Sequence, residues 1–276
     1  MTGPLVSVDW LKDHINDPDL VILDASMKGN DSGLAPEFPD IQIPEARYFD
    51  LKGKFSDKNS HLPNTLPNEE AFRNAAQELG INNESKLVIY DNIGAYSSPR
   101  VWWMFKTMGH LHVSVLDGGL SAWKNAGLPT QSFTENTYPK GNFEANRNNA
   151  SVKDAEAVLA NIDAGDFLTI DARSAGRFKA ESPEPRNDLR GGHIPNSVNL
   201  PFKQVLHDGK FKTPEALKSI FEELNPPKKP MTFTCGSGLT ACIILLAAEL
   251  ADYHQLAVYD GSWTDWGSRS DLPIEP

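Results

Sequence analysis

The stretch KLVIYDNIGAYSS at residues 86–98 decides the fold, because it recurs in altered form as PMTFTCGSGLTAC at residues 230–242. Three further stretches recur in the same order, each at a similar distance from its counterpart. They are LVILDAS (20–26) with FLTIDAR (167–173), IPEARYFDL (43–51) with IPNSVNLPF (194–202), and VSVLDGGLSAW (113–123) with LAVYDGSWTDW (256–266). Four collinear matches predict two copies of one domain.

A polar segment separates the two copies. Residues 130–150, TQSFTENTYPKGNFEANRNNA, carry Pro and Gly and lack apolar periodicity, as linkers do. We therefore predict an N-terminal domain at residues 1–130, a linker at 131–150 and a C-terminal domain at 151–276.

Within each copy, short β-rich runs alternate with helical patterns. This alternation predicts an α/β fold of two tandem domains, each a parallel sheet with helices on both faces. Asn68–Leu79 and Thr213–Leu224 read as helices, the second with Thr213 as N-cap and Pro214 in its first turn. The predicted strands are Val21–Leu23, Leu87–Tyr90, Val113–Leu116, Phe167–Ile170, Thr232–Thr234 and Leu256–Val258.

Composition limits the environment and the partners. A net charge of -11 in 276 residues argues against nucleic acid or an anionic membrane as partner. No apolar run approaches the ~20 residues of a membrane span, and no secretory signal is visible. Two cysteines give no disulfide framework. We expect a cytoplasmic protein.

Cys235 follows a predicted strand and precedes a predicted helix, where parallel sheets form their sites. No further Cys or His stands at ligand spacing for a metal, and no Cys-x-x-Cys pair exists. The glycine loop lacks the lysine of a P-loop, and Ala241 stands where a Cys-x5-Arg phosphatase has arginine. Cys242 reads as a small core residue. The counterpart of Cys235 in the first copy is Asp91, so only the second copy can carry a thiol reaction.

Two interpretations remain open, on the residues alone, for the stretch CGSGLT at residues 235–240, which we call the Cys235 loop. In one, Gly236 and Gly238 let backbone N–H groups surround a sulfur anion, and the N-terminus of the following helix stabilises the thiolate. Ser237 and Thr240 could then donate hydroxyl hydrogen bonds to the sulfur. In the other, Cys235 is a buried structural residue before a tight turn.

The motifs CGSGLTA (235–241), DGSW (260–263) and GHIPNSVNLPF (192–202), with the two-copy layout, resemble the rhodanese-type sulfurtransferases over essentially the whole chain. The resemblance implies an inactive first copy and a second copy with the catalytic cysteine. Members that use thiosulfate typically carry two cations directly after that cysteine. This chain has Gly236 and Ser237 there, and so resembles members that use 3-mercaptopyruvate.

The resemblance also implies roles for individual residues. Arg177 and Arg186, in GRFKAESPEPRNDLRGGHIP, would hold the carboxylate and keto group of the donor. Asp50 and His61, in ARYFDLKGKFSDKNSHLPN, would form a hydrogen-bonded relay with Ser237 beside Cys235. The loop residues that would line the substrate site are Gly236, Ser237, Gly238, Leu239 and Thr240.

The implied reaction is a two-step sulfur transfer through a Cys235 persulfide, with release of pyruvate. The acceptor would be a thiol, a thioredoxin-like protein or cyanide, and we expect neither a metal nor another cofactor. Two alternatives stay open: thiosulfate as the main donor, and a non-catalytic persulfide carrier or binding module.

Overall fold

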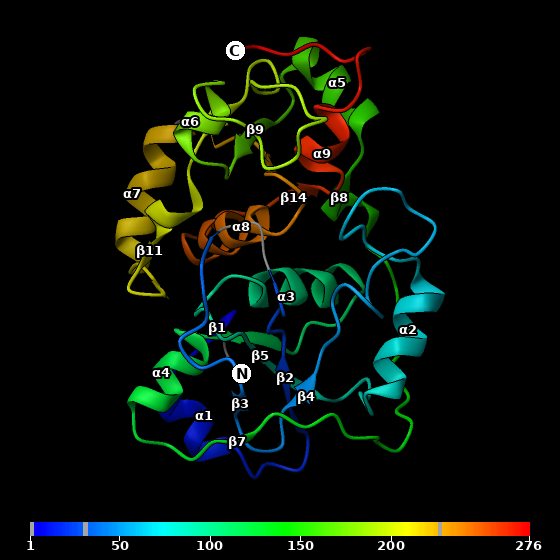
Figure 1. The fold of residues 1–276 in the computed structure, drawn as a ribbon, viewed down its shortest axis with the longest axis vertical. Helices are drawn as coiled ribbons and strands as arrows, with labels where there is room; N and C mark the ends of the chain where they lie inside the picture. The colour runs from blue at the N-terminus through cyan, green and yellow to red at the C-terminus, as the bar shows by residue number, and fades with distance from the viewer. Residues whose placement is uncertain (1–2, 30–32, 226–227) are drawn as a thin grey trace. The chain divides into compact units, whose positions relative to one another are not determined.

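The computed structural model describes residues 3–29, 33–225 and 228–276, and the chain divides into two compact units (Figure 1). Unit 1 is formed by Met1–Lys58, Leu66–Asn148 and Asp208–Phe211. Unit 2 is formed by Asn59–Thr65, Asn149–His207 and Lys212–Pro276. Each unit therefore includes one short segment from the half of the chain that forms the other.

Unit 1 contains a parallel five-stranded sheet in the order β1-β6-β5-β2-β4. Two short strands, β3 and β7, pair antiparallel beside it. The elements of this unit are β1 (Leu5–Val6), α1 (Val8–His14), β2 (Leu20–Asp24), β3 (Ile41–Gln42), β4 (Arg47–Tyr48), α2 (Glu69–Glu78), β5 (Lys86–Tyr90), α3 (Ser98–Thr107), β6 (Val113–Leu116), α4 (Gly119–Asn125), β7 (Gln131–Ser132) and β12 (Lys210–Phe211).

Unit 2 contains a second parallel sheet, in the order β8-β14-β13-β9-β10, which repeats the strand order of unit 1. Its elements are the 3-10 helices η1 (Asn149–Ser151) and η2 (Phe202–Val205), the strands β8 (Val152–Lys153), β9 (Leu168–Asp171), β10 (Val198–Asn199), β11 (Leu206–His207), β13 (Met231–Thr234) and β14 (Leu256–Tyr259), and the helices α5 (Ala155–Ala164), α6 (Ala175–Phe178), α7 (Pro214–Leu224), α8 (Thr240–Leu250) and α9 (Ser262–Trp266).

The predicted α/β class is confirmed, and the six predicted strands are present with ends that differ by at most one residue. Helix α2 begins one residue later than predicted because Asn68 is its N-cap, whereas α7 has the predicted N-cap, Thr213. Asn68 Oδ1 accepts a hydrogen bond from Ala71 N at 2.9 Å. Thr213 Oγ1 accepts one from Ala216 N at 3.4 Å, and Pro214 opens the helix.

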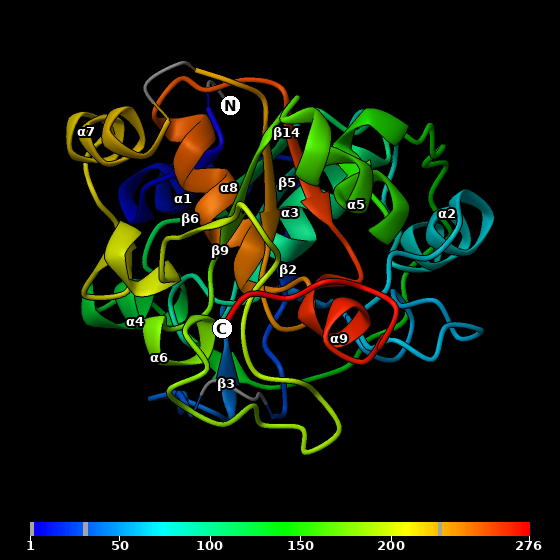
Figure 2. The ribbon, with the colours of Figure 1, turned by 90° about the horizontal axis from the view of Figure 1, so that it is seen from above.

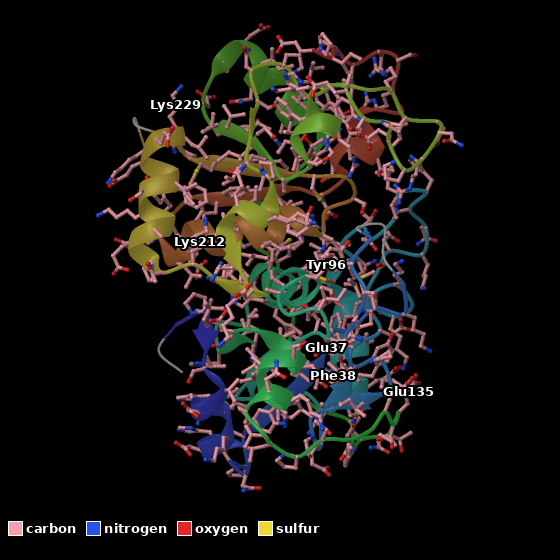
Figure 3. All side chains as sticks on the ribbon, turned by 60° about the vertical axis from the view of Figure 1, so that its left-hand side comes forward. Glu37, Phe38, Tyr96, Glu135, Lys212 and Lys229 are labelled. Carbon is pink, nitrogen blue, oxygen red and sulfur yellow. The ribbon has the colours of Figure 1, made fainter. Side chains whose placement is uncertain are left out.

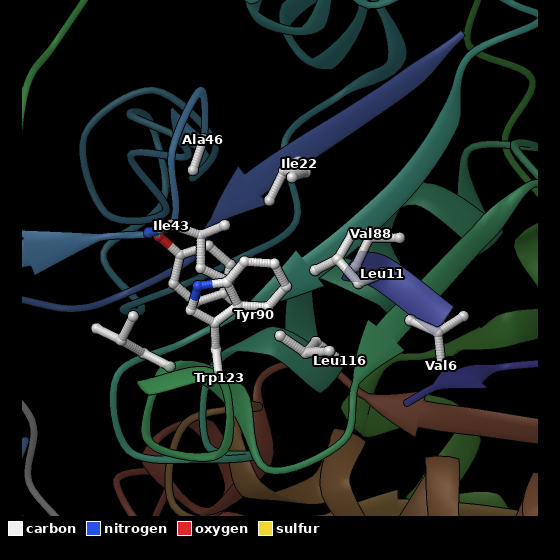
Figure 4. Close-up of a cluster of buried hydrophobic side chains, with 10 residues drawn as sticks. Val6, Leu11, Ile22, Ile43, Ala46, Val88, Tyr90, Leu116 and Trp123 are labelled. Atoms are coloured by element: carbon white, nitrogen blue, oxygen red, sulfur yellow. Dashed lines mark hydrogen bonds between the residues drawn. The ribbon is translucent and has the colours of Figure 1, made fainter. Parts of the chain in front are cut away.

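Helices cover both faces of each sheet. In unit 1, side chains of α1 and α4 pack on one face against Ile22, Val88 and Tyr90 (Figure 4). Alternate residues of the same strands point to the other face, which α3 covers. In unit 2, α5 and α9 lie on one side of the sheet and α7 and α8 on the other (Figures 1 and 2).

Helix α8 is apolar on all sides. Every residue from Ala241 to Ala248 is buried, Cys242 among them, which confirms Cys242 as a core residue. Within the described residues, no helix is long and apolar enough to cross a membrane.

The start of α4 depends on a glycine. Gly119 has a φ of +55°, and a Cβ there would lie 2.4 Å from the Asp91 carbonyl oxygen and 2.8 Å from that of Gly94. Gly127 has a φ of +73° but open space around the Cβ position. We predict that Gly119→Ala destabilises unit 1 by more than about 3 kcal/mol and Gly127→Ala by about 1 kcal/mol, the cost of a left-handed backbone alone.

Hydrogen exchange of peptides from β5 and α3, followed by mass spectrometry, would measure the two variants against the wild type. Equal exchange in both variants would contradict the steric origin of the effect.

Candidate active site

Cys235 lies at the carboxyl end of β13, directly before the turn into α8, and is 2% exposed. The start of α9 holds this position. Cys235 N donates to Ser262 Oγ at 3.2 Å, and the Cys235 carbonyl accepts from Trp263 N at 2.9 Å. The Gly236 carbonyl accepts from both the N–H and the hydroxyl of Thr264, at 2.9 and 2.7 Å. The base of the loop is therefore fixed on one side by α9.

The other side of the loop is a set of backbone amides. Leu239 is the N-cap of α8, and its side chain makes no capping bond. Within the part of the chain that the structure describes, the N–H groups of Gly236, Ser237, Leu239 and Thr240 donate no hydrogen bond to another protein group. Amides at a helix N-terminus favour an anion. The turn can therefore stabilise a sulfur anion on Cys235.

Only one of the two predicted glycines supplies the unusual backbone conformation. Gly238 has a φ of +80°, whereas Gly236 is outside the left-handed region. Gly236 instead lies against a neighbouring side chain. A Cβ at this position would lie 3.2 Å from Nη2 of Arg177, tighter than an ordinary contact. The small residue after Cys235 therefore lets a guanidinium approach the loop.

The corresponding loop of unit 1 encloses a carboxylate. Asp91 Oδ1 accepts from the N–H groups of Ile93 and Gly94 at 2.9 and 3.1 Å. Asp91 Oδ2 accepts from three further backbone N–H groups and one hydroxyl at 2.7–3.0 Å, those of Tyr96 (labelled in Figure 3), Ser97 and Ser98. In unit 2 this turn carries the Cys235 thiol, whereas in unit 1 its N–H groups are bonded to the carboxylate of Asp91 in the same turn.

Arg177, predicted to hold a substrate carboxylate, is placed beside the Cys235 loop by Glu184. Its Nη2 lies 2.5 Å from Glu184 Oε2, and its Nε lies 3.2 Å from each carboxylate oxygen. The Arg177 side chain is 24% exposed and that of Glu184 only 2%. The buried carboxylate thus fixes an arginine that still reaches solvent. Sequence reasoning missed Glu184, because a glutamate in a Pro- and Glu-rich loop reads as solvated.

Glu184 belongs to a buried ion network centred on Arg173. The Arg173 guanidinium contacts Asp171 at 2.6 Å and Glu184 at 2.8 Å, and stacks 4.2 Å from the centre of the Trp263 ring. Burial alone would lower the pKa of Arg173, but the two carboxylates raise it. Two arginines and two carboxylates balance the charge, so the network is neutral beneath the loop.

The first copy lacks this network. Ser26 stands at the position of Arg173, two residues after Asp24, the counterpart of Asp171. Asp24 is 2% exposed, and burial raises its pKa. Tyr90 is among its hydrogen-bonding partners. Asp171 in unit 2 belongs to the ion network that supports Arg177. Its counterpart in unit 1, Asp24, is a buried carboxyl group without that arginine.

Arg186 and Arg190 are both half-buried but make different contacts. Arg186 Nη1 donates to Thr264 Oγ1, the hydroxyl that is bonded to the Gly236 carbonyl. Arg186 is thereby linked to the Cys235 loop through one side chain. Arg190 donates to the carbonyls of Trp266, Gly267, Arg269 and Leu272 and thus holds the C-terminal segment.

The predicted relay residues lie in different surroundings. His61 belongs to unit 2 through the segment Asn59–Thr65, and its side chain is exposed. Asp50 belongs to unit 1, where its Oδ1 accepts from Gly53 N at 2.8 Å. Ser237 is contacted by Asn64, a residue that the sequence did not single out. A contact across 173 positions of the chain leaves no local pattern to find.

No group of three or more His, Cys, Asp or Glu side chains in the described ranges is arranged to hold a metal ion. The polar groups gathered at the loop are instead backbone amides, hydroxyls and guanidinium groups. Such donors suit an anionic substrate and an anionic sulfur.

Known proteins resemble this chain over almost its full length. The 3-mercaptopyruvate sulfurtransferase of Escherichia coli K12 is 40% identical over 275 residues, which are 98% of this chain and 97% of the relative. The thiosulfate sulfurtransferase of Rattus norvegicus is 39% identical over 276 residues, 96% of this chain and 92% of the relative.

A solved structure and a protein family agree with these relatives. The crystal structure of SseA from Escherichia coli, described as a 3-mercaptopyruvate sulfotransferase with the rhodanese fold, superposes with a TM-score of 0.83 at 38% identity, covering 95% of this chain and 99% of that one. The rhodanese-like domain family matches residues 7–126 and again residues 154–269. The resemblance predicted from the sequence is therefore confirmed, and the chain belongs to the rhodanese family.

Proposed function

We propose that this protein is a sulfurtransferase that moves sulfur from 3-mercaptopyruvate, through a persulfide on Cys235, to a second acceptor. The observation that carries this proposal is the amide-lined turn at Cys235 with the Arg177 guanidinium directly beside it. The relatives named for 3-mercaptopyruvate and for thiosulfate support the reaction type and leave two donors to be distinguished.

The first step is an attack of the Cys235 thiolate on the thiol sulfur of 3-mercaptopyruvate. A sulfur–sulfur bond forms as the carbon–sulfur bond breaks, and the bonding electrons leave with the carbon as the enolate of pyruvate. Protonation of that enolate gives pyruvate. The backbone amides of Gly236, Ser237, Leu239 and Thr240 stabilise the sulfur anion, as an oxyanion hole stabilises an alkoxide. This step leaves one additional sulfur atom on Cys235.

In the second step an acceptor thiolate attacks the outer sulfur of the persulfide and releases the Cys235 thiolate. A small thiol or a thioredoxin-like protein would serve in this way, and cyanide would leave as thiocyanate. Because the enzyme alternates between two covalent forms, we expect ping-pong kinetics.

The charge around the loop favours 3-mercaptopyruvate over thiosulfate. The two residues after Cys235 are neutral, so the loop itself offers no cation to a dianion. The available cations are Arg177 and Arg186, which are suited to a carboxylate and an adjacent keto group. Arg177 is already held by Glu184, and this reduces the loss of side-chain freedom when the donor binds.

Proton transfer during turnover is assigned to Ser237, His61 and Asp50. Ser237 would donate its hydroxyl to the sulfur or to the carbonyl oxygen of the leaving pyruvate. His61 would supply the proton that the enolate takes up, with Asp50 orienting its ring. The exposure of His61 supports exchange of that proton with solvent.

The choice of donor is tested by comparing kcat/KM for the two compounds with cyanide as acceptor. We predict a value at least about tenfold higher for 3-mercaptopyruvate, the equivalent of 1.4 kcal/mol of transition-state stabilisation. Intact-mass measurement without acceptor should show a gain of one sulfur in the wild type and none in Cys235→Ser. A preference for thiosulfate would reverse the donor assignment. Sulfur gain without turnover would favour a persulfide carrier.

The grip on the carboxylate is tested with Glu184→Gln. Removal of one carboxylate from the buried network should lower the free energy of unfolding by about 3 kcal/mol and loosen Arg177. We therefore expect KM for 3-mercaptopyruvate to rise about tenfold, with a smaller change in kcat. The matched control is Glu156→Gln, which breaks the solvent-exposed pair with Arg269 in the same unit and should leave both values unchanged. An unaltered KM in Glu184→Gln would separate the network from substrate binding.

The role of His61 is tested with His61→Ala. Because the side chain is exposed, we predict an unchanged melting temperature but a kcat reduced about 100-fold, the usual size of a lost acid–base contribution. His254→Ala removes another exposed histidine of unit 2 and serves as the control. If both variants kept wild-type kinetics, His61 and Asp50 would have no place in the reaction.

A further inference from the structure

The segment Asn59–Thr65 comes from the first half of the chain but packs in unit 2. Side-chain hydroxyls hold its shape. Ser60 Oγ and Thr65 Oγ1 are hydrogen-bonded at 2.8 Å, Leu62 N donates to Ser60 Oγ, and Thr65 Oγ1 donates to the Leu62 carbonyl. This compact turn places the side chain of Asn64 against the Cys235 loop.

Asn64 is 8% exposed and has a φ of +59°. Its Nδ2 lies 3.1 Å from Ser237 Oγ and 3.2 Å from the Ser237 carbonyl oxygen. One amide group therefore contacts both the side chain and the backbone of the residue two positions after Cys235. Because asparagine tolerates the left-handed region better than most residues, the backbone here can present that amide without a glycine.

The direction of the hydrogen bond has a chemical consequence. An amide N–H is only a donor, so Ser237 Oγ acts as acceptor toward Asn64. The single hydrogen of the Ser237 hydroxyl then remains available to be donated elsewhere. An amide does not take up a proton near neutral pH, so Asn64 cannot act as a base toward Ser237.

In unit 1 a segment of different sequence lies against the corresponding loop. There the segment from the other half of the chain is Asp208–Phe211, and it approaches the Asp91 loop through Gly209, whose carbonyl oxygen would lie 2.8 Å from a Cβ on Gly94. A glycine offers the loop no side chain. Among the described residues, an asparagine amide thus contacts the loop that carries the thiol, whereas the Gly209 backbone approaches the loop that carries its own carboxylate.

We infer that Asn64 is a positioning residue for sulfur transfer, which holds Ser237 so that its hydroxyl is a hydrogen-bond donor to the sulfur on Cys235 or to the reacting donor. The inference rests on the proposed function. Asn64 does not touch the substrate itself. Its effect should therefore fall on the rate of persulfide formation and only slightly on donor binding.

Two substitutions test this assignment. Asn64→Gly keeps the left-handed backbone and deletes the amide. Asn64→Asp keeps the shape but replaces the donor with an acceptor, which would draw the Ser237 hydroxyl toward itself and repel the Ser237 carbonyl. The matched control is Asn196→Gly, also in unit 2, where φ is +63° and Nδ2 donates to the Ile162 carbonyl.

The readout is single-turnover persulfide formation from 3-mercaptopyruvate, followed by intact mass and normalised to titrated Cys235 thiol so that partial misfolding does not enter the rate. We expect Asn64→Gly to slow the step about tenfold and Asn64→Asp to slow it further, with the half-saturating donor concentration changed less than about twofold. Asn196→Gly should react at the wild-type rate.

A double-mutant cycle identifies the route of the effect. In a Ser237→Ala background, Asn64→Gly should slow the step less than about twofold, because the hydroxyl that it orients is already gone. A tenfold loss that persists in that background would overturn the inference, as would wild-type rates in both Asn64 variants. A wild type that gains no sulfur from 3-mercaptopyruvate or thiosulfate would overturn the proposed function as well.

Discussion

Backbone N–H groups at a turn from a strand into a helix need an acceptor, and both halves of this chain are built around that requirement. In unit 1 the Asp91 carboxylate accepts hydrogen bonds from five backbone N–H groups and the Ser98 hydroxyl. In unit 2 the same turn carries Cys235, and within the described ranges the N–H groups of Gly236, Ser237, Leu239 and Thr240 donate to no other protein group. One side chain thus decides whether the turn serves stability or chemistry.

The chemistry also depends on charge placed beneath the turn. Glu184 and Asp171 are almost fully buried, and they are compatible with the fold only because Arg173 lies between them. The second oxygen of Glu184 then fixes Arg177, whose guanidinium reaches the loop at Gly236. The guanidinium places a positive charge beside the loop. The Cys235 loop can therefore do without cations of its own.

Much of this could be predicted from the sequence, because the relevant signals are local or repeated. The repeated stretches identified the two copies of one domain, and the alternation of short β-rich runs with helical patterns identified the fold class and the strands. The loop glycines were only partly understood. Gly238 has the expected left-handed backbone, whereas Gly236 does not and lies against Arg177. Glu184 and Asn64 were missed. The polar neighbours of Glu184 in the sequence conceal its burial, and the partner of Asn64 is distant in the sequence.

The two units differ at a small number of positions around a shared backbone. Unit 2 has Cys235 in place of Asp91 and Arg173 in place of Ser26. Asn64 contacts the Cys235 loop, whereas the Gly209 backbone lies against the Asp91 loop of unit 1. Each replacement in unit 2 adds a group that either reacts, carries charge or donates a hydrogen bond, while the sheet order is unchanged. A fold that already encloses an anion needs only such exchanges to hold a reactive sulfur. Comparison of the Asp91 turn with the Cys235 turn therefore separates the shared structural features from the groups that are particular to unit 2.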